Sequence, residues 1–217
     1  MKEADTMVTK TILWDYNGTI LDDAQLTLDV ENQLLKERGM KGNYSMDAYR
    51  HLFCFPVLDY YRKLGYTFET ESFEEVAEEF HRLYAAGFSK CGCVDGVREK
   101  LAESMDKGYR NVIISASRQD KLEEQIESLG LRSYFADLIG IDNLLAGSKV
   151  GQAKAWMAET GTDPDTCHMI GDTLHDLETS MAIGVHDCTL VAQGHQAYDV
   201  LKDRWPNTVH TMREVVL

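Results

Sequence analysis

The sequence predicts an α/β protein, with a Rossmann-like parallel sheet as its core and a small helical bundle inserted after the first strand. From about residue 92 onward, short apolar runs rich in β-formers alternate with helical patterns, as in a parallel sheet covered on both faces. A similar run, Thr11–Trp14, stands alone near the N-terminus, and only helical patterns separate it from the others. We therefore expect residues 1–21 and 92–217 to form the core and residues 22–91 to form a helical cap.

The cap is expected to contain about four helices. Ser72 begins a Ser-x-x-Glu capping box, Ser45 can cap an earlier helix, Gly39 is a good helix stop, and Pro56 forces a break. The expected helices span Ala24–Arg38, Ser45–Phe53, Val57–Leu64 and Ser72–Ala86.

The remaining elements follow from the alternation in the second part of the chain. Apolar β-forming runs predict strands, and longer amphipathic stretches predict the helices between them. The expected strands are Asn111–Ser115, Asp137–Ile141, Cys167–Ile170 and Cys188–Val191, and the expected helices are Val97–Lys107, Gln119–Leu129, Gly151–Thr160 and Asp176–Ala182.

Composition restricts the possible partners. The net charge of −14 argues against nucleic acid and anionic membranes, which are held by Lys/Arg patches, but it allows a small anionic substrate. No run approaches the roughly 20 apolar residues that span a bilayer, and the first residues lack the apolar core of a signal peptide. We expect a cytoplasmic protein, a monomer or weak homodimer, whose five cysteines are reduced thiols.

Four polar elements lie at or just beyond the ends of predicted strands. They are Asp15, Ser115, the loop that carries Lys149, and Asp172. In open parallel sheets, ligands bind outside the carboxyl ends of the strands where the strand order reverses. These elements are therefore expected to converge on one site.

The residue types at these positions suit phosphate chemistry. A carboxylate such as Asp15 can accept a phosphoryl group and divide hydrolysis into two steps, and Asp172 with Asp176 would supply oxygen ligands to Mg²⁺. The Ser115 hydroxyl and the next backbone N–H could bind phosphate, and Lys149 could neutralise developing charge. Each has a plainer alternative: acids that stabilise a helix N-terminus, a serine N-cap, and a solvated lysine.

Taken in order, these motifs resemble those of the haloacid dehalogenase superfamily, and in particular its phosphoglycolate phosphatase-like members with a small helical cap. The matching segments are Asp15-x-Asn17-Gly18-Thr19, hydrophobic-Ser115, Lys149, and Gly171-Asp172-x-x-x-Asp176. The resemblance implies an Mg²⁺-dependent phosphatase with Asp15 as nucleophile, acting on a small phosphorylated metabolite such as a phosphoglycolate-like or sugar phosphate. It implies metal ligands at Asp15, Asp172, Asp176 and the backbone carbonyl of Asn17, and phosphate contacts from Gly18, Thr19, Ser115, Ala116 and Lys149.

Asn17 departs from this family's pattern. Phosphatases of the family carry an aspartate there, which protonates the leaving group and then activates water. Asn cannot exchange that proton, and loss of a general acid/base lowers the rate by roughly 10²–10⁴. Asn17 therefore occupies a catalytic position, and its amide is expected to impair turnover.

Four explanations stay open for Asn17. The protein could be a slow phosphatase or one that acts on good leaving groups; it could borrow an acid/base from His175, His51, Tyr60 or Tyr61; it could be a non-catalytic phosphate binder; or the Asn could be an engineered trap. Asn17-Gly18 is also prone to deamidation, which would create Asp at position 17. Carbon–phosphorus cleavage would need a desolvated cap lysine, and nothing marks Lys36, Lys41 or Lys63 as one.

The cap is expected to close over the site and to exclude water. Its hinges would lie near Leu21–Ala24 and Ser89–Asp95. The aromatic side chains of the segment His51–Pro56 would either contact the substrate or, as we favour, pack the cap against the core.

Overall fold

A computed structural model describes residues 10–142 and 149–217. Its main feature is a six-stranded sheet in the order β5-β4-β1-β6-β7-β8, in which every neighbouring pair is parallel. β1 is central, so the chain builds one half of the sheet with β4 and β5 and the other half with β6, β7 and β8. The strands are β1 Thr11–Trp14, β4 Arg110–Arg118, β5 Asp137–Ile141, β6 Cys167–Gly171, β7 Asp187–Val191 and β8 Thr208–Val209.

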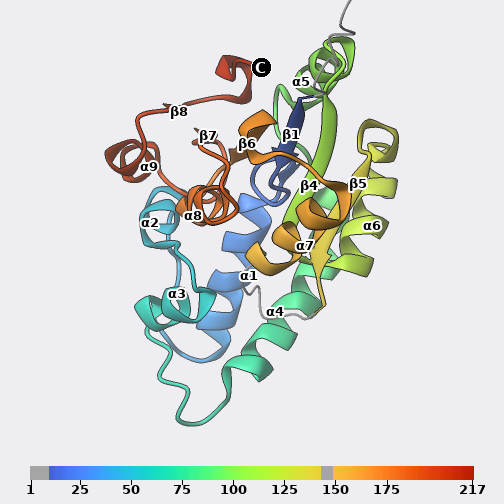
Figure 1. Cartoon of the computed structure of the whole chain (residues 1–217). Helices are drawn as coiled ribbons and strands as arrows, with labels where there is room; N and C mark the ends of the chain where they lie inside the picture. The colour runs from blue at the N-terminus through green and yellow to red at the C-terminus, as the bar shows by residue number, and fades with distance from the viewer. Residues whose placement is uncertain (1–9, 143–148) are drawn as a thin grey trace, which may run out of the picture.

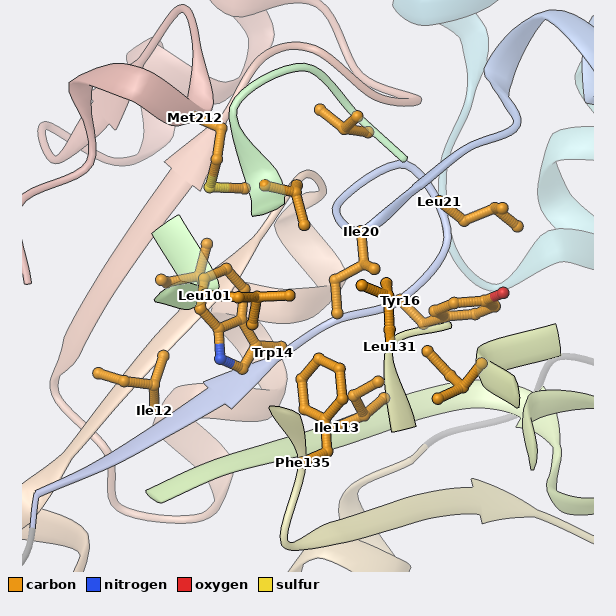
Figure 2. Close-up of a cluster of buried hydrophobic side chains, with 14 of the residues drawn as sticks. Ile12, Trp14, Tyr16, Ile20, Leu21, Leu101, Ile113, Leu131, Phe135 and Met212 are labelled. Atoms are coloured by element: carbon orange, nitrogen blue, oxygen red, sulfur yellow. The ribbon is translucent and has the colours of Figure 1, made fainter. Parts of the chain in front are cut away.

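Successive strand residues point to opposite faces of this sheet, and both faces are apolar and covered by helices. Ile12 and Trp14 join the cluster that α5 and α6 cover, which Figure 2 shows at close range. Leu13 joins the opposite cluster, under α7 to α9. The helices are α5 Val97–Asp106, α6 Gln119–Ser128, α7 Val150–Thr160, α8 Leu174–Ala182 and α9 Tyr198–Arg204, with short 3₁₀ turns η1 Phe88–Lys90, η2 Arg132–Tyr134, η3 Pro164–Thr166 and η4 Met212–Glu214.

Residues 24–90 form a helical segment of their own between the first strand and the rest of the sheet. Figure 1 shows its helices gathered in the lower part of the molecule. Ser45 accepts a hydrogen bond from the Ala48 N–H, and Ser72 forms the predicted capping box with Glu75. Tyr49, Tyr60, Tyr61 and Tyr66 belong to a third buried cluster confined to this segment. The helices are α1 Ala24–Glu37, α2 Met46–Leu52, α3 Val57–Leu64 and α4 Phe73–Gly87.

The two ends of the helical segment lie side by side. β2 (Leu21–Asp22) pairs antiparallel with β3 (Gly92–Cys93) in a separate two-stranded sheet. The segment therefore leaves the α/β part and returns to it at one place.

The predicted fold class is confirmed, and the expected strands and helices occur within a few residues of their predicted bounds. The sequence analysis missed β2, β3, β8 and α9. It also ended β4 too early: the strand continues to Arg118, and its register against β5 shifts between Ile114 and Arg118. In the described part of the chain, no helix is long and apolar enough to span a membrane. Gly147 and Ser148, which precede Lys149, lie outside the described residues.

Candidate active site

Three of the four predicted polar elements converge. Asp15 follows β1, and its N–H donates to the carbonyl of Ile170 in the adjacent β6. Asp172 follows β6, and Lys149 directly precedes α7. The carboxyl ends of β1 and β6 thus bring Asp15 and Asp172 together with Lys149, as the rule for open parallel sheets requires. Ser115 lies within β4, before its end at Arg118.

Three carboxylates form the centre of the site. Oxygens of Asp15, Asp172 and Asp176 all lie within 4.8 Å of one another, and all three residues are buried. Lys149 is 1% exposed, and its ammonium bonds both Asp15 and Asp176, the latter at 2.5 Å. Three negative charges against one positive charge leave a negative excess in a buried place. This donor set, oxygen-only and short of positive charge, fits a divalent cation.

The pKa values of the three carboxyl groups reflect this excess of negative charge. Burial and the charge of Asp176 raise the pKa of Asp15 well above its ordinary value, although Lys149 acts in the opposite direction. Burial likewise raises the pKa of Asp172 to about 6, despite the lowering effect of His195. For Asp176, burial acts upward, but the ammonium of Lys149 outweighs it and the pKa is lowered. A bound cation would favour the ionised form of all three carboxyls.

Asp176 combines the two interpretations that the sequence left open. Its Oδ2 accepts hydrogen bonds from the Thr173 N–H (2.9 Å) and hydroxyl (2.7 Å), which completes a capping box at the start of α8. Its Oδ1 faces Lys149. Asp176 is therefore both a helix cap and a member of the acidic cluster.

Two glycines let the backbone approach Asp172 closely. A Cβ on Gly18 would lie 2.4 Å from the Asp172 Oδ2 atom, and one on Gly194 would lie 2.1 Å from it. Real Cβ atoms do not come this close, so both positions exclude side chains. Asp172 is held by the Thr19 hydroxyl at 3.0 Å and the His195 N–H at 2.6 Å.

Asn17 lies beside the cluster with its side chain fully engaged. Its Nδ2 donates to Asp23 (2.8 Å) and to the Tyr84 hydroxyl (3.3 Å), and its Oδ1 accepts from the Ser117 hydroxyl at 2.6 Å. One of the two groups that accept from the Asn17 amide is thus a carboxylate. An amide at position 17 supplies one of the donors to Asp23, which a second carboxylate could not do unless it were protonated.

Asp23 and His195 form a buried pair that the sequence analysis missed. Asp23 Oδ1 lies 3.3 Å from His195 Nε2, and the Tyr84 hydroxyl donates to Asp23 Oδ2 at 2.6 Å. Burial lowers the pKa of His195, but the Asp23 charge outweighs it and raises that pKa to about 9. The ring is therefore cationic at neutral pH. Asp23 precedes a helix and resembles an N-cap, and His195 lies in a loop, so neither carried a recognisable signal.

The residues expected to bind phosphate have their own contacts. The Gly18 N–H donates to Leu21 O and Asp23 Oδ1, both at 2.9 Å, and the hydroxyl of Thr19 donates to Asp172. The Ser115 hydroxyl is buried and accepts from the Ser117 N–H at 3.0 Å. Ala116 lines the cavity described next. Their roles as phosphate ligands stay predictions.

A cavity of about 470 Å³ opens onto the acidic cluster. Asp15, Asn17, Lys149, Asp172 and Asp176 line one part of it, and aromatic side chains of the helical segment line another. Its volume falls in the range of small-molecule sites.

The aromatic segment joins the helical segment to the α/β part, as we favoured, and also lines the cavity. Phe55 stacks on His175 with ring centroids 4.3 Å apart, and Phe53 packs on His195 at 5.1 Å. His175 is a cavity-lining residue, and its Nε2 is buried without a hydrogen-bond partner in the described part of the chain.

The other weak acid/base candidates are poorly suited to that role. His51 is absent from the cavity lining and interacts with Asp47 and Asp199 at the surface. Tyr60 and Tyr61 do line the cavity, but burial raises both of their pKa values well above the ordinary range, which makes them weaker acids.

Other reactive side chains lie outside the site. Lys36, Lys41 and Lys63 are exposed, so none is the desolvated amine that carbon–phosphorus cleavage would need. All five cysteines are free thiols, as expected.

Comparison with known proteins agrees with this fold. Residues 12–190 match the profile of the haloacid dehalogenase-like hydrolases. The chain therefore belongs to this hydrolase family.

Individual relatives are distant. The tyrosine-protein kinase PtkA of Mycobacterium tuberculosis is 24% identical over 202 residues, which are 92% of this chain and 67% of that protein. The haloacid dehalogenase-like protein SP0104 of Streptococcus pneumoniae has a similar structure, with a TM-score of 0.78 and 17% identity over 95% of this chain and 96% of that one. A Lactobacillus delbrueckii subsp. bulgaricus protein assigned as a phosphoglycolate phosphatase has a TM-score of 0.77 and is 19% identical. The match covers 96% of this chain and 97% of that one.

Proposed function

We propose that this protein is an Mg²⁺-dependent phosphomonoester hydrolase that acts on a small organic phosphate through an aspartyl-phosphate at Asp15. One observation carries the proposal: a buried cluster of three carboxylates and a lysine meets a cavity of about 470 Å³ at the carboxyl edge of the sheet. Membership of the hydrolase family supports it.

Asp15, Asp172, Asp176 and the backbone carbonyl of Asn17 would hold the Mg²⁺. When bound, the cation neutralises charge on the substrate phosphate and on the nucleophile. Lys149, placed between Asp15 and Asp176, would act with the cation to favour the ionised nucleophile and would stabilise charge that develops during transfer. The attacking Asp15 oxygen forms a bond to phosphorus while the bond from phosphorus to the leaving oxygen breaks, and the leaving oxygen takes a proton from solvent. Water then attacks the phosphorus, the bond from phosphorus to Asp15 breaks, and inorganic phosphate leaves with the Asp15 carboxylate restored.

Phosphate oxygens would be bound by the segment that follows Ile114 and by the turn after Asp15. Ser115 and Ala116 lie where β4 loses its regular register against β5, which frees backbone N–H groups from the ladder. Gly18, Thr19 and Lys149 complete the proposed set.

The helical segment, extended to residues 22–91, would act as a cap over this site. Its ends meet at the β2–β3 pair, so hinges near Leu21–Ala24 and Ser89–Asp95 would be adjacent. Such a cap suits a small phosphorylated metabolite. A cytoplasmic location and a monomer or weak homodimer complete the proposal.

A second candidate function is phosphate-ligand binding with little or no turnover. Asn17 favours it, because its amide cannot exchange a proton and is held by three hydrogen bonds. The kinase name of the mycobacterial relatives adds an intermediate case, in which the phosphoryl group on Asp15 passes to an acceptor other than water.

Hydrolysis of p-nitrophenyl phosphate and a panel of small phosphates, with and without Mg²⁺, tests the proposal. Asp15→Asn is the negative control, and intact mass confirms the amide at residue 17. Mg²⁺-dependent release of phosphate by the parent, absent in the variant, supports an enzyme. Phosphate binding without release supports the second function, and a phosphorylated acceptor supports transfer. Failure of both binding and release contradicts the proposal.

A further inference from the structure

The cavity contains a buried acidic side chain that is distant from the phosphate chemistry. Glu31, on α1, is 3% exposed and lines the cavity. The hydroxyl of Tyr61 is its hydrogen-bonding neighbour, but its Oε2 atom is buried with no hydrogen-bond partner among the described residues. A buried polar atom without a partner is unfavourable, so a ligand group that bonds Oε2 would be stabilised there.

Glu31 lies at a defined distance from the chemistry. Asp23, Thr27 and Glu31 follow one another at four-residue intervals, which places them on one face of α1, and all three line the cavity. Asp23 contacts Asn17 at the catalytic end. Since a helix rises 1.5 Å per residue, Glu31 lies about 12 Å farther along the axis.

Much of the cavity wall is aromatic, and the charge of Glu31 acts on two of its tyrosines, Tyr60 and Tyr61. Tyr60, Tyr61, Phe53 and Phe73 line the cavity together with Glu31. Aromatic faces carry partial negative charge and attract cations, and quaternary ammonium groups are bound in such cages. The Glu31 carboxyl group and the aromatic ring faces therefore both favour a bound cation.

Among the described residues, the lysines and arginines that could act on Glu31 are paired with other carboxylates. Arg38 is the basic residue whose charge acts on it, but that guanidinium is paired with Glu71 and Glu79. Four lysines and arginines line the cavity, and each is paired elsewhere: Arg82 with Glu79, Arg118 with Asp120, Lys121 with Glu124, and Lys149 with Asp15 and Asp176.

We propose that Glu31 and the surrounding rings form a subsite for a positively charged nitrogen at the end of the leaving group. The substrate is then a zwitterion, with its phosphate at Asp15 and an amine or quaternary ammonium at Glu31, whose backbone lies about 12 Å along α1 from Asp23. This assignment rests on the proposed function for the phosphate end only. Burial raises the pKa of Glu31 to about 8, and a cation at Oε2 would reverse that shift.

Three phosphates of equal chain length test the subsite: 6-aminohexyl, hexyl and 6-hydroxyhexyl phosphate. The parent should prefer the amine over both others by about 10- to 100-fold in kcat/KM, the range of a charge-assisted hydrogen bond. Glu31→Gln keeps the shape and removes the charge, so the preference should disappear. Glu37→Gln, exposed on the same helix, should retain it.

Binding of the product alcohols separates the two proposals. 6-Aminohexan-1-ol and hexan-1-ol are titrated by calorimetry into the parent and both variants, and this needs no turnover. If no phosphate is hydrolysed while the amino alcohol binds through Glu31, the subsite stands and the hydrolase proposal falls. If the parent shows no preference for the amine, or Glu31→Gln keeps it, the subsite proposal is wrong. The parent measurement decides even if the variant does not fold.

Discussion

At residue 17, the side-chain amide complements the hydrogen-bonding groups around it. Asp23 accepts from Asn17, from the Gly18 N–H and from the Tyr84 hydroxyl, and it pairs with His195. Placing an aspartate at position 17 would set two carboxylates at hydrogen-bond distance, where they repel unless they share a proton. Restoring the family's usual residue therefore requires a change at position 23 as well.

We predict that Asn17→Asp alone raises phosphatase activity only weakly, whereas Asn17→Asp with Asp23→Asn raises kcat by roughly 10²–10⁴. The double variant keeps one amide and one carboxylate in the pair. Steady-state hydrolysis of p-nitrophenyl phosphate measures the difference, with Asp23→Asn alone as the control. Equal gains in the single and double variants would show that Asp23 has no such influence.

Glu31 gives a prediction on stability. Burial, only partly offset by the Tyr61 hydroxyl and the charge of Arg38, raises its pKa from 4.5 to about 8. The folded protein therefore keeps a proton that the unfolded chain releases above pH 4.5, and the stability this provides is lost as pH rises toward about 8. Relative to the parent, Glu31→Gln should gain free energy of unfolding across that window, by at most about 1.4 kcal/mol per pH unit.

Urea unfolding of the parent and Glu31→Gln between pH 4.5 and 8 measures this gain. Glu37→Gln, on the exposed side of the same helix, should show no such trend. A constant difference between parent and Glu31→Gln at all pH values would mean that Glu31 titrates normally.

At the scale of the elements, helix caps give the clearest separation of stability from activity. Ser72 caps α4 through a full capping box, at a position that does not line the cavity. Ser72→Ala should lower the free energy of unfolding by about 1 kcal/mol and leave kcat unchanged. Denaturant unfolding and a phosphatase assay on the same sample test both parts, and a fall in kcat would show that the first turn of α4 also affects the site.

Sequence patterns predicted the long elements because each buries a continuous apolar face. β1 illustrates this: Ile12 and Trp14 face one core cluster and Leu13 the other. The missed strands β2, β3 and β8 have two residues each, too few for any period to show. The predicted end of β4 at Ser115 was wrong, since the strand continues through a shifted register.

The candidate site was predictable only where strand ends marked it. Asp15, Ser115 and Asp172 follow apolar runs, and parallel strands bring such ends together. Asp23 and His195 become neighbours only through tertiary packing, because one begins α1 and the other lies in the loop after β7. Glu31 resembled any acid on an amphipathic helix, and its burial depends on the tyrosines of α3.

At the scale of the whole molecule, α2 holds the helical segment against the α/β part. Arg50 donates to the carbonyls of Gly194 (2.8 Å) and Gln193 (2.7 Å), and its own carbonyl accepts from the Ala197 N–H. The same loop supplies His195, whose N–H holds Asp172. Closure of the helical segment and the geometry of the acidic cluster therefore share one loop.

We expect Arg50→Ala to raise KM about tenfold, the effect of losing a hydrogen bond from a charged donor, and to speed amide hydrogen exchange in α2. Arg62→Ala, on the exposed face of α3, serves as the matched control. Unchanged exchange in α2 would show that Arg50 does not hold the segment closed.

The adjacent ends of the helical segment also bear on how such proteins diversify. A piece of chain that departs and rejoins at the paired strands Leu21–Asp22 and Gly92–Cys93 can be exchanged between relatives as a cassette, without rethreading the sheet. In this protein the cassette would carry Asp23 and Tyr84, both partners of the Asn17 side chain. Exchange of this segment would therefore change the partners of residue 17. It would change which residue fits at position 17, and with it whether the protein turns over its phosphate ligand or only binds it.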